Sequence, residues 1–70
     1  RAMTTHYVMR ATLCLTVYMQ DPEIRKQRIG KELERLAFED VQAMVQFPDE
    51  WFSDTDRQQF NVLRHGFHLD

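Results

Sequence analysis

Three histidines and one cysteine are the residues of this chain that could hold a transition metal. His65 and His68 have the HxxH spacing of many zinc ligands, and His6 and Cys14 are the other soft ligands. Gly66 lies between the two C-terminal histidines, where we expect it to end a helix in the left-handed conformation. The two side chains then do not share a helix face, and the pattern predicts no metal site and no cofactor.

Cys14 and four carboxylates are the residues that could act in catalysis. Cys14 with a distant histidine is the composition of a nucleophile and its base. Two close pairs of acids could divide the roles of general acid and general base, namely Asp49 with Glu50 and Asp54 with Asp56. These acids lie in surface-loop composition, and 70 residues leave little volume for a pocket that excludes water. We therefore expect a protein that is not an enzyme.

The segment Gln46 to Asp54, QFPDEWFSD, combines large aromatic side chains with carboxylates. Aromatic residues, tryptophan above all, concentrate the binding energy of interfaces, but a small core needs them as well. We expect Phe47 and Phe52 to enter the core and Trp51 to stay partly exposed, with the acids as a polar rim. The expected partner is a protein with a basic surface, and the predicted partner-binding residues are Trp51, Asp49, Glu50 and Asp54.

Charge is distributed unevenly along the chain, although the net charge is only −2. Five lysines and arginines lie between Pro22 and Arg35, together with three acids. Six acids and no lysine or arginine lie between Phe38 and Asp56. Two solvated faces of opposite sign would explain this pattern, and so would surfaces for charged partners.

Length and cysteine content indicate one small cytoplasmic domain over residues 1–70. Domains of this size bury only about 60% of the surface of the unfolded chain, so their stability is marginal. Cys14 alone cannot form an intrachain disulfide, and no stretch approaches the roughly 18 apolar residues that cross a bilayer. We expect a bacterial or phage protein without membrane contact, and we interpret Arg1 and Ala2 as a remnant before a native start at Met3.

Residues Tyr7 to Met19 alternate between apolar and polar side chains with the two-residue period of a strand. No glycine or proline interrupts the run, so it cannot fold back as a hairpin. A lone strand leaves its backbone groups unpaired, and we expect it to pair with a second copy in a homodimer or with another protein. The predicted fold class is α+β: a long N-terminal strand at 3–20, a helical pair at 21–47, the acidic aromatic turn at 48–53, and a C-terminal helix and tail at 54–70.

A helix is expected from Pro22 to Ala37, with Asp21 as its cap. Its spacing predicts one buried apolar stripe, formed by Ile29, Leu33 and Leu36. Gly30 either weakens this helix by about 1 kcal/mol relative to alanine or permits the close approach of a packed neighbour.

Two shorter elements are expected after this helix. A helix from about Glu39 to Gln46 ends at Phe47-Pro48, because the residue before a proline is excluded from helical conformation. Ser53 can cap a third helix. The alternative makes Phe60 to Leu69 a strand that pairs with the first strand, which gives a β-α-α-β arrangement.

The run LTVYMQDPEIRKQRIGKELERLAFEDVQAMVQ resembles the ribbon-helix-helix layout, in which strands of two copies pair and two helices follow. The resemblance covers about half of the chain and implies, as an alternative function, a dimeric DNA-binding regulator or antitoxin. The exposed strand face would read base edges, and here it offers Arg10, Thr12 and Thr16. Glu39 and Asp40 stand where the family's second helix meets phosphate, and the isoelectric point near 5.9 gives no basic footprint. We therefore expect a regulator, inhibitor or adaptor that binds protein, and we favour nucleic acid less.

Overall fold

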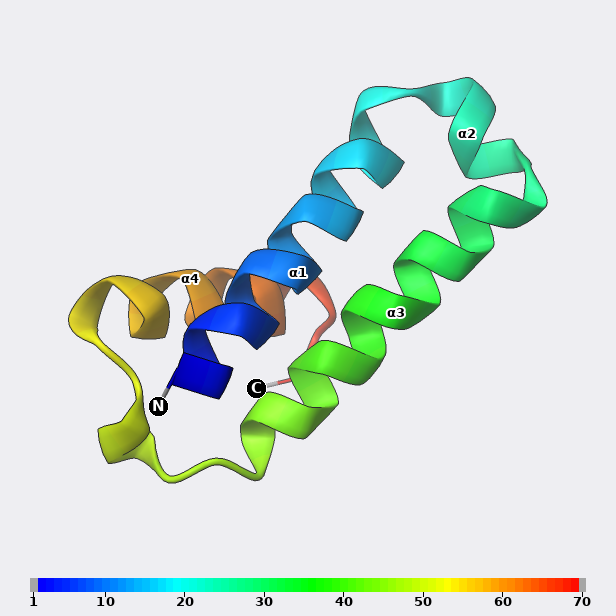
Figure 1. The fold of residues 1–70 in the computed structure, drawn as a ribbon. Helices are drawn as coiled ribbons and strands as arrows, with labels where there is room; N and C mark the ends of the chain where they lie inside the picture. The colour runs from blue at the N-terminus through cyan, green and yellow to red at the C-terminus, as the bar shows by residue number, and fades with distance from the viewer. Residues whose placement is uncertain (1, 70) are drawn as a thin grey trace.

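The computed structural model describes residues 2–69, and within that range it contains helices and no strand. Helix α1 (Ala2–Gln20) and helix α3 (Arg28–Val45) form an antiparallel hairpin whose tip is the short helix α2 (Pro22–Lys26) (Figure 1). The 3-10 helix η1 (Asp49–Trp51) leads to helix α4 (Asp54–Gly66), which packs against the half of the hairpin away from α2. The α+β prediction is therefore wrong. Arg1 lies outside the described residues, and the predicted N-terminal remnant is not tested.

Helix α1 stands where the long strand was predicted, because its sequence has a helical period as well as an alternating one. Thr4, Val8 and Ala11 are buried at positions i, i+4 and i+7, which places them on one face of a helix. The hydroxyls of Thr12 and Thr16 each donate to the backbone carbonyl four residues earlier, at 2.7 Å. No glycine or proline interrupts α1, so its backbone groups are satisfied within the helix. The unpaired strand edge that favoured a homodimer is absent from the described residues.

The predicted helix start at Pro22 is confirmed, but the helices that follow divide at a different residue. The Asp21 side chain caps α2 by accepting the backbone N–H of Glu23 at 2.9 Å, and Pro22 takes the first helical position. The chain leaves helical conformation at Gln27, with φ −93° and ψ 167°. Helix α3 then runs without a break through the predicted boundary near Glu39. The expected helical pair is thus one short helix and one long helix.

Gly30 marks the place where α2 packs on α3. A Cβ atom at this position would lie 2.0 Å from the carbonyl oxygen of Ile24 and 2.8 Å from the Cα of Arg25. Both are backbone atoms, so they cannot move aside as the end of a flexible side chain could. Close approach, one of the two explanations for this glycine, is confirmed.

Helix α4 confirms the predicted third helix and contradicts the alternative strand at Phe60 to Leu69. Ser53 caps the helix by accepting the backbone N–H of Asp56 at 3.1 Å. The end of the helix differs from the prediction, because Gly66 is still helical and His68 takes the left-handed conformation, with φ 59°. Backbone hydrogen bonds of the Schellman pattern close the helix around His68.

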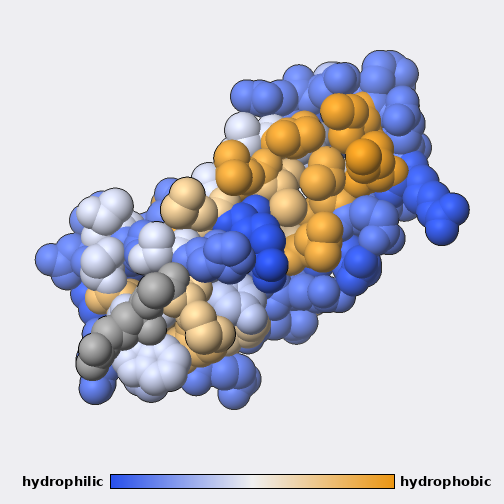
Figure 2. All heavy atoms as spheres, in the orientation of Figure 1, coloured by the Kyte–Doolittle hydropathy of each residue, from blue (hydrophilic) through white to orange (hydrophobic). Residues whose placement is uncertain are grey.

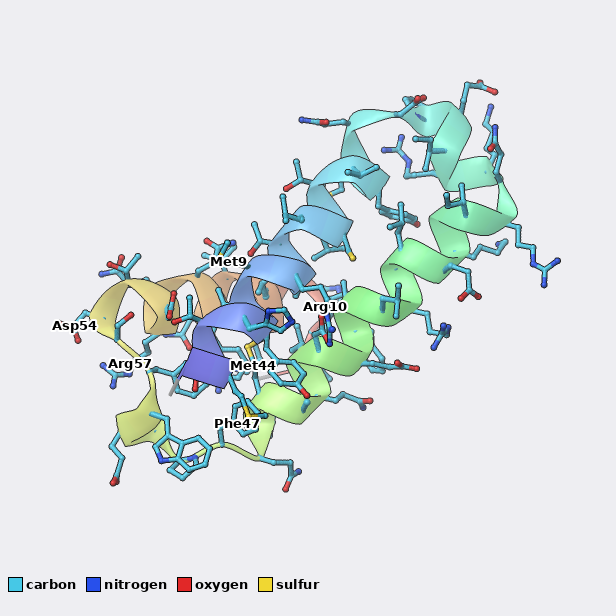
Figure 3. The ribbon with its side chains drawn as sticks, in the orientation of Figure 1. Met9, Arg10, Met44, Phe47, Asp54 and Arg57 are labelled. Atoms are coloured by element: carbon cyan, nitrogen blue, oxygen red, sulfur yellow. The ribbon has the colours of Figure 1, made fainter. Side chains whose placement is uncertain are left out.

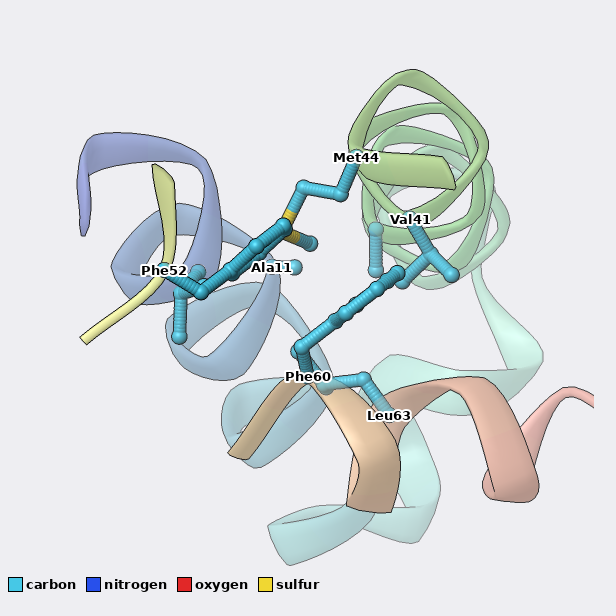
Figure 4. Close-up of a cluster of buried hydrophobic side chains, with 8 residues drawn as sticks. Ala11, Val41, Met44, Phe52, Phe60 and Leu63 are labelled. Atoms are coloured by element: carbon cyan, nitrogen blue, oxygen red, sulfur yellow. The ribbon is translucent and has the colours of Figure 1, made fainter. Parts of the chain in front are cut away.

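The hydrophobic core lies where α4 meets the hairpin. The rings of Phe52 and Phe60 stack with their centroids 4.9 Å apart and an interplanar angle of 6° (Figure 4). Ala11, Val41 and Met44 pack around these rings and are fully buried. On the half of the hairpin nearer α2, one side is covered by no third element among residues 2–69, and apolar side chains remain on its surface.

Candidate protein-interaction surfaces

Arg10 and Asp40 form an ion pair that joins the middle of α1 to α3. The guanidinium donates through Nε to Oδ2 at 2.9 Å and through Nη2 to Oδ1 at 2.7 Å. The Asp40 side chain is 4% exposed, whereas the Arg10 side chain is 47% exposed and also lies over the ring of Tyr7. Hydrogen bonding to Asp40, with its negative charge, raises the pKa of Arg10 above its usual range. Arg10 is therefore engaged within the fold, between α1 and α3 (Figure 3).

The three residues predicted to read DNA in the alternative function do not form a reading surface. Arg10 is paired with Asp40, and the hydroxyl of Thr12 accepts from Nε2 of Gln59 at 3.2 Å. Thr16 bonds within its own helix. All three lie on a helix, and residues 2–69 contain no strand to present them. The ribbon-helix-helix layout is contradicted, and the strand face that would read base edges is absent from residues 2–69.

The acidic aromatic segment folds as η1 and its flanking residues. Phe52 is buried and Trp51 is 39% exposed, as the sequence predicted, whereas Phe47 is only half-buried and packs against the core from its edge. The centroid of the Trp51 ring lies 5.5 Å from that of Phe47, which in turn packs edge-on against Tyr7 at 5.4 Å. Trp51 is therefore held by an aromatic neighbour but keeps part of its surface available to a partner.

Arg57 organises the carboxylates of this segment, and the sequence reasoning did not single it out. Its guanidinium lies 3.4 Å from Oδ1 of Asp49 and 3.3 Å from Oδ1 of Asp54. It also donates to the backbone carbonyl of Asp49 at 3.2 Å. Its position in the sequence was a usable signal, because it is the single lysine or arginine between Phe38 and Leu63. Of the predicted partner-binding residues, Asp49 and Asp54 are thus partly neutralised.

A groove of about 530 Å³ runs between α1 and α4 and was not foreseen from the sequence. We name it the α1–α4 groove. Its most exposed apolar side chains are Met9 and Leu13 from α1 and Val62 from α4, each exposed between 58% and 63%. Figure 3 shows Met9 on the side of α1 that faces α4. The sequence did not reveal this groove, because the strand predicted for residues 3–20 placed Met9 and Leu13 on its buried face.

Polar contacts fix the two walls of the α1–α4 groove relative to each other. The Thr5 hydroxyl donates to Oδ2 of Asp56 at 2.6 Å, and the Gln59 amide donates to the Thr12 hydroxyl at 3.2 Å. Asp56 carries the only charge among the described residues that line the groove. The groove is therefore pre-formed, with mostly apolar exposed surface between its polar residues, and it is acidic at the end where α4 begins.

A second apolar surface lies on the half of the hairpin nearer α2, and we name it the hairpin face. It consists of Cys14 and Val17 from α1 and Ile29, Leu33 and Leu36 from α3. The apolar residues of each helix form a stripe, and each stripe leads to one member of the Arg10–Asp40 ion pair. Arg10 precedes Cys14 by four residues on α1, and Asp40 follows Leu36 by four residues on α3. Residues four apart share a helix face, so the ion pair places both stripes on the same side of the hairpin. Figure 2 shows hydrophobic side chains gathered on this half of the molecule.

The expected burial of the α3 stripe is wrong, most clearly at its α2 end. Ile29 is 57% exposed, Leu36 is also exposed and Leu33 is half-buried. No third element among residues 2–69 covers this stripe, whereas the end of α4 lies beside other residues of the same half, among them Leu15 and Tyr18. Amphipathic periodicity thus identified an apolar face correctly without showing what covers it.

Of the groups considered for chemistry, Asp49 and Asp54 both contact the guanidinium of Arg57, which offsets part of their charge. No cluster of three or more histidine, cysteine, aspartate or glutamate side chains suited to a metal ion occurs among residues 2–69. Cys14 is a free, half-buried thiol, and burial, with the nearby charge of Asp40, raises its pKa. A thiol with a raised pKa is less reactive as a nucleophile near neutral pH.

Comparisons with known protein families, with curated proteins and with solved structures found no match. No helix in the described part of the chain combines the length and the apolar character that crossing a bilayer requires. The two apolar surfaces and the acidic aromatic segment are thus the features from which a function can be inferred.

Proposed function

We propose that this protein is a non-enzymatic regulator or adaptor that binds a helical segment of another protein in the α1–α4 groove. The observation that carries the proposal is the exposure of Met9, Leu13 and Val62 along one apolar groove. Contiguous exposed apolar groups are typical of binding surfaces, and a groove between two helices suits the apolar face of an amphipathic helix. The single free Cys14 fits an action in the reducing cytoplasm.

The proposed partner segment is basic. Asp56 lines the groove, Asp54 lies two residues before it at the start of α4, and η1 adds Asp49 and Glu50. Arg57 offsets part of this charge but leaves the end of the molecule acidic. Lysines or arginines beside the apolar face of a bound helix would be attracted to these carboxylates. Trp51 is the aromatic residue of this acidic end that stays partly open to the partner.

A synthetic peptide tests the proposal without knowledge of the natural partner. The probe is a labelled 18-residue helix with leucines on one face and lysines on the other, titrated with the protein by fluorescence anisotropy. The matched probe replaces each lysine with glutamate and keeps the apolar face. We expect the lysine peptide to bind at least tenfold more tightly, with added salt weakening its binding, and the methyl signal of Met9 to shift in NMR spectra.

Two matched substitutions locate the binding site. Val62→Gln removes an exposed β-branched residue of the groove, and we expect it to weaken binding of the lysine peptide about tenfold, as loss of a buried apolar side chain does. Ile29→Gln makes the same kind of change on the hairpin face and should leave the affinity unchanged. Equal binding of both peptides, or binding that Val62→Gln does not weaken, contradicts the proposal.

A further inference from the structure

We infer that the hairpin face is covered by a second copy of this chain, packed antiparallel, so that two hairpins form a four-helix arrangement. This inference concerns a different surface from the α1–α4 groove and does not depend on the proposed function. Ile29 is 57% exposed on a stripe whose spacing is that of a buried helix face. The chain exposes 5061 Å², whereas a compact monomer of 8.5 kDa exposes about 4,700 Å². The excess is consistent with an uncovered face.

The charges that border the hairpin face are complementary to those of a second, antiparallel copy. Arg28 lies at the α2 end of the α3 stripe, and its side chain forms no ion pair or hydrogen bond within the described residues. Its charge acts on Glu32, but the carboxylate of Glu32 is already bonded to Arg35. Glu39 lies at the other end, where it and Glu32 share the single guanidinium of Arg35. One end of the face is therefore basic and the other is acidic. Antiparallel packing brings opposite charges together, whereas parallel packing brings like charges together.

The positions of these charges agree with a twofold axis through the apolar stripe. Arg28 and Glu39 are eleven residues apart on α3, which is about 16 Å along a helix. A twofold axis that pairs Arg28 of each copy with Glu39 of the other passes midway between them, at Leu33 and its neighbours. The apolar residues would then meet their own counterparts at the centre, with the ion pairs at both ends, as a self-complementary interface requires.

The same polarity extends to the whole molecule. The cation-rich segment from Pro22 to Arg35 lies at the tip of the hairpin, and η1, with Asp49 and Glu50, lies at the opposite end of a body 38 Å long (Figure 1). Antiparallel packing places the basic tip of each copy toward the acidic half of the other. Long-range attraction therefore favours the same orientation as the local pairs do.

Solution mass measured across protein concentration tests the inference. Sedimentation equilibrium or light scattering, in the presence of a reductant so that Cys14 cannot cross-link two copies, should show a dimer that dissociates on dilution. Ile29→Gln should raise the dissociation constant at least tenfold, because a twofold interface contains the substitution twice. Val17→Ser, on the other stripe, should do the same, whereas Val62→Gln on α4 should leave the constant unchanged.

Charge reversal tests the orientation. Arg28→Glu and Glu39→Arg should each weaken the dimer, and the double variant should recover most of the loss, because each reversed residue then meets its reversed partner. Circular dichroism checks that every variant remains helical. A protein that stays monomeric at the highest attainable concentration overturns the inference. So does a dimer that neither Ile29→Gln nor Val17→Ser weakens, and failure of the double variant to recover overturns the antiparallel packing.

Discussion

Arg10 and Asp40 are 30 positions apart in the chain, yet their side chains form two hydrogen bonds. Read along the sequence, Arg10 was a candidate for contact with DNA and Asp40 a carboxylate at a helix start. Each residue was interpreted on its own element. Residues 3–20 were assigned as a strand and not as a helix, and the helix that contains Asp40 was expected to start near Glu39 and not at Arg28. A partner from a distant segment is invisible to local pattern, because spacing within one element says nothing about which element packs against it.

The two members of this ion pair should not contribute equally to stability. Arg10→Ala leaves the carboxylate of Asp40, which is 4% exposed, without its partner, and we expect a loss of about 2 to 4 kcal/mol. Asp40→Asn leaves Arg10, which is 47% exposed and can be solvated, and we expect a loss of about 1 kcal/mol or less. Urea denaturation of both variants measures the difference, and equal losses would contradict this account of the pair.

The residues of the acidic aromatic segment were only partly predictable. Burial of Phe52 and partial exposure of Trp51 followed from the need of a small domain for core aromatics. The role of Arg57 did not follow, because its contact with Asp49 depends on the turn that folds η1 back toward the start of α4. Whether Trp51, Asp49, Glu50 and Asp54 contact a partner remains a prediction.

At the scale of elements, the two capped helix starts were predictable, whereas the break at Gln27 and the N-terminal helix were not. Asp21-Pro22 and Ser53 mark helix starts through hydrogen bonds to neighbouring residues, so the signal is contained in the local sequence. Residues 3–20 are apolar at so many positions that a period of two and a period of 3.6 both fit them. Packing of Val8 and Ala11 against α3 decides between the two.

Gly30 and Gly66 offer a matched test of element packing. Gly30→Ala gains about 1 kcal/mol of helix propensity, but its Cβ would lie 2.0 Å from the carbonyl oxygen of Ile24. We expect the clash to prevail and the melting temperature to fall by several degrees. Gly66→Ala adds a Cβ that meets nothing within 4 Å in a helical residue, and the melting temperature should rise by a few degrees. Opposite signs in thermal melts are expected, and an increase for Gly30→Ala would refute tight packing at the tip.

At the scale of the whole molecule, stability depends on one small core shared by α1, α3, η1's flanking residue Phe52, and α4. The contacts of Phe60 illustrate this, because its ring stacks on Phe52 and reaches Val41 of α3 (Figure 4). No single pair of helices contains this core. Without α4, the half of the hairpin away from α2 would lack the side chains that shield it from water.

Phe60→Ala therefore tests whether the core is a single cooperative unit. We expect a loss of about 3 to 5 kcal/mol, which is comparable to the whole stability of a domain of this size. Val62→Ala on the same helix changes an exposed residue and should cost less than about 0.5 kcal/mol. Circular dichroism during urea denaturation compares the two. A Phe60→Ala variant with near wild-type stability would show that α4 does not complete the core.

The sequence by itself determined that helices start after the caps Asp21 and Ser53, that Phe52 is internal, and that opposite charges are concentrated in separate segments. These properties depend on near neighbours in the chain or on composition, so they can be read without coordinates. Tertiary structure alone decided that residues 3–20 are helical, that Arg10 is paired with Asp40, and that α4 covers one half of the hairpin and leaves the hairpin face open. The physical reason is that the burial of a side chain depends on the element that packs against its own element. An apolar stripe indicates that something should cover it, and only the tertiary structure shows whether anything does.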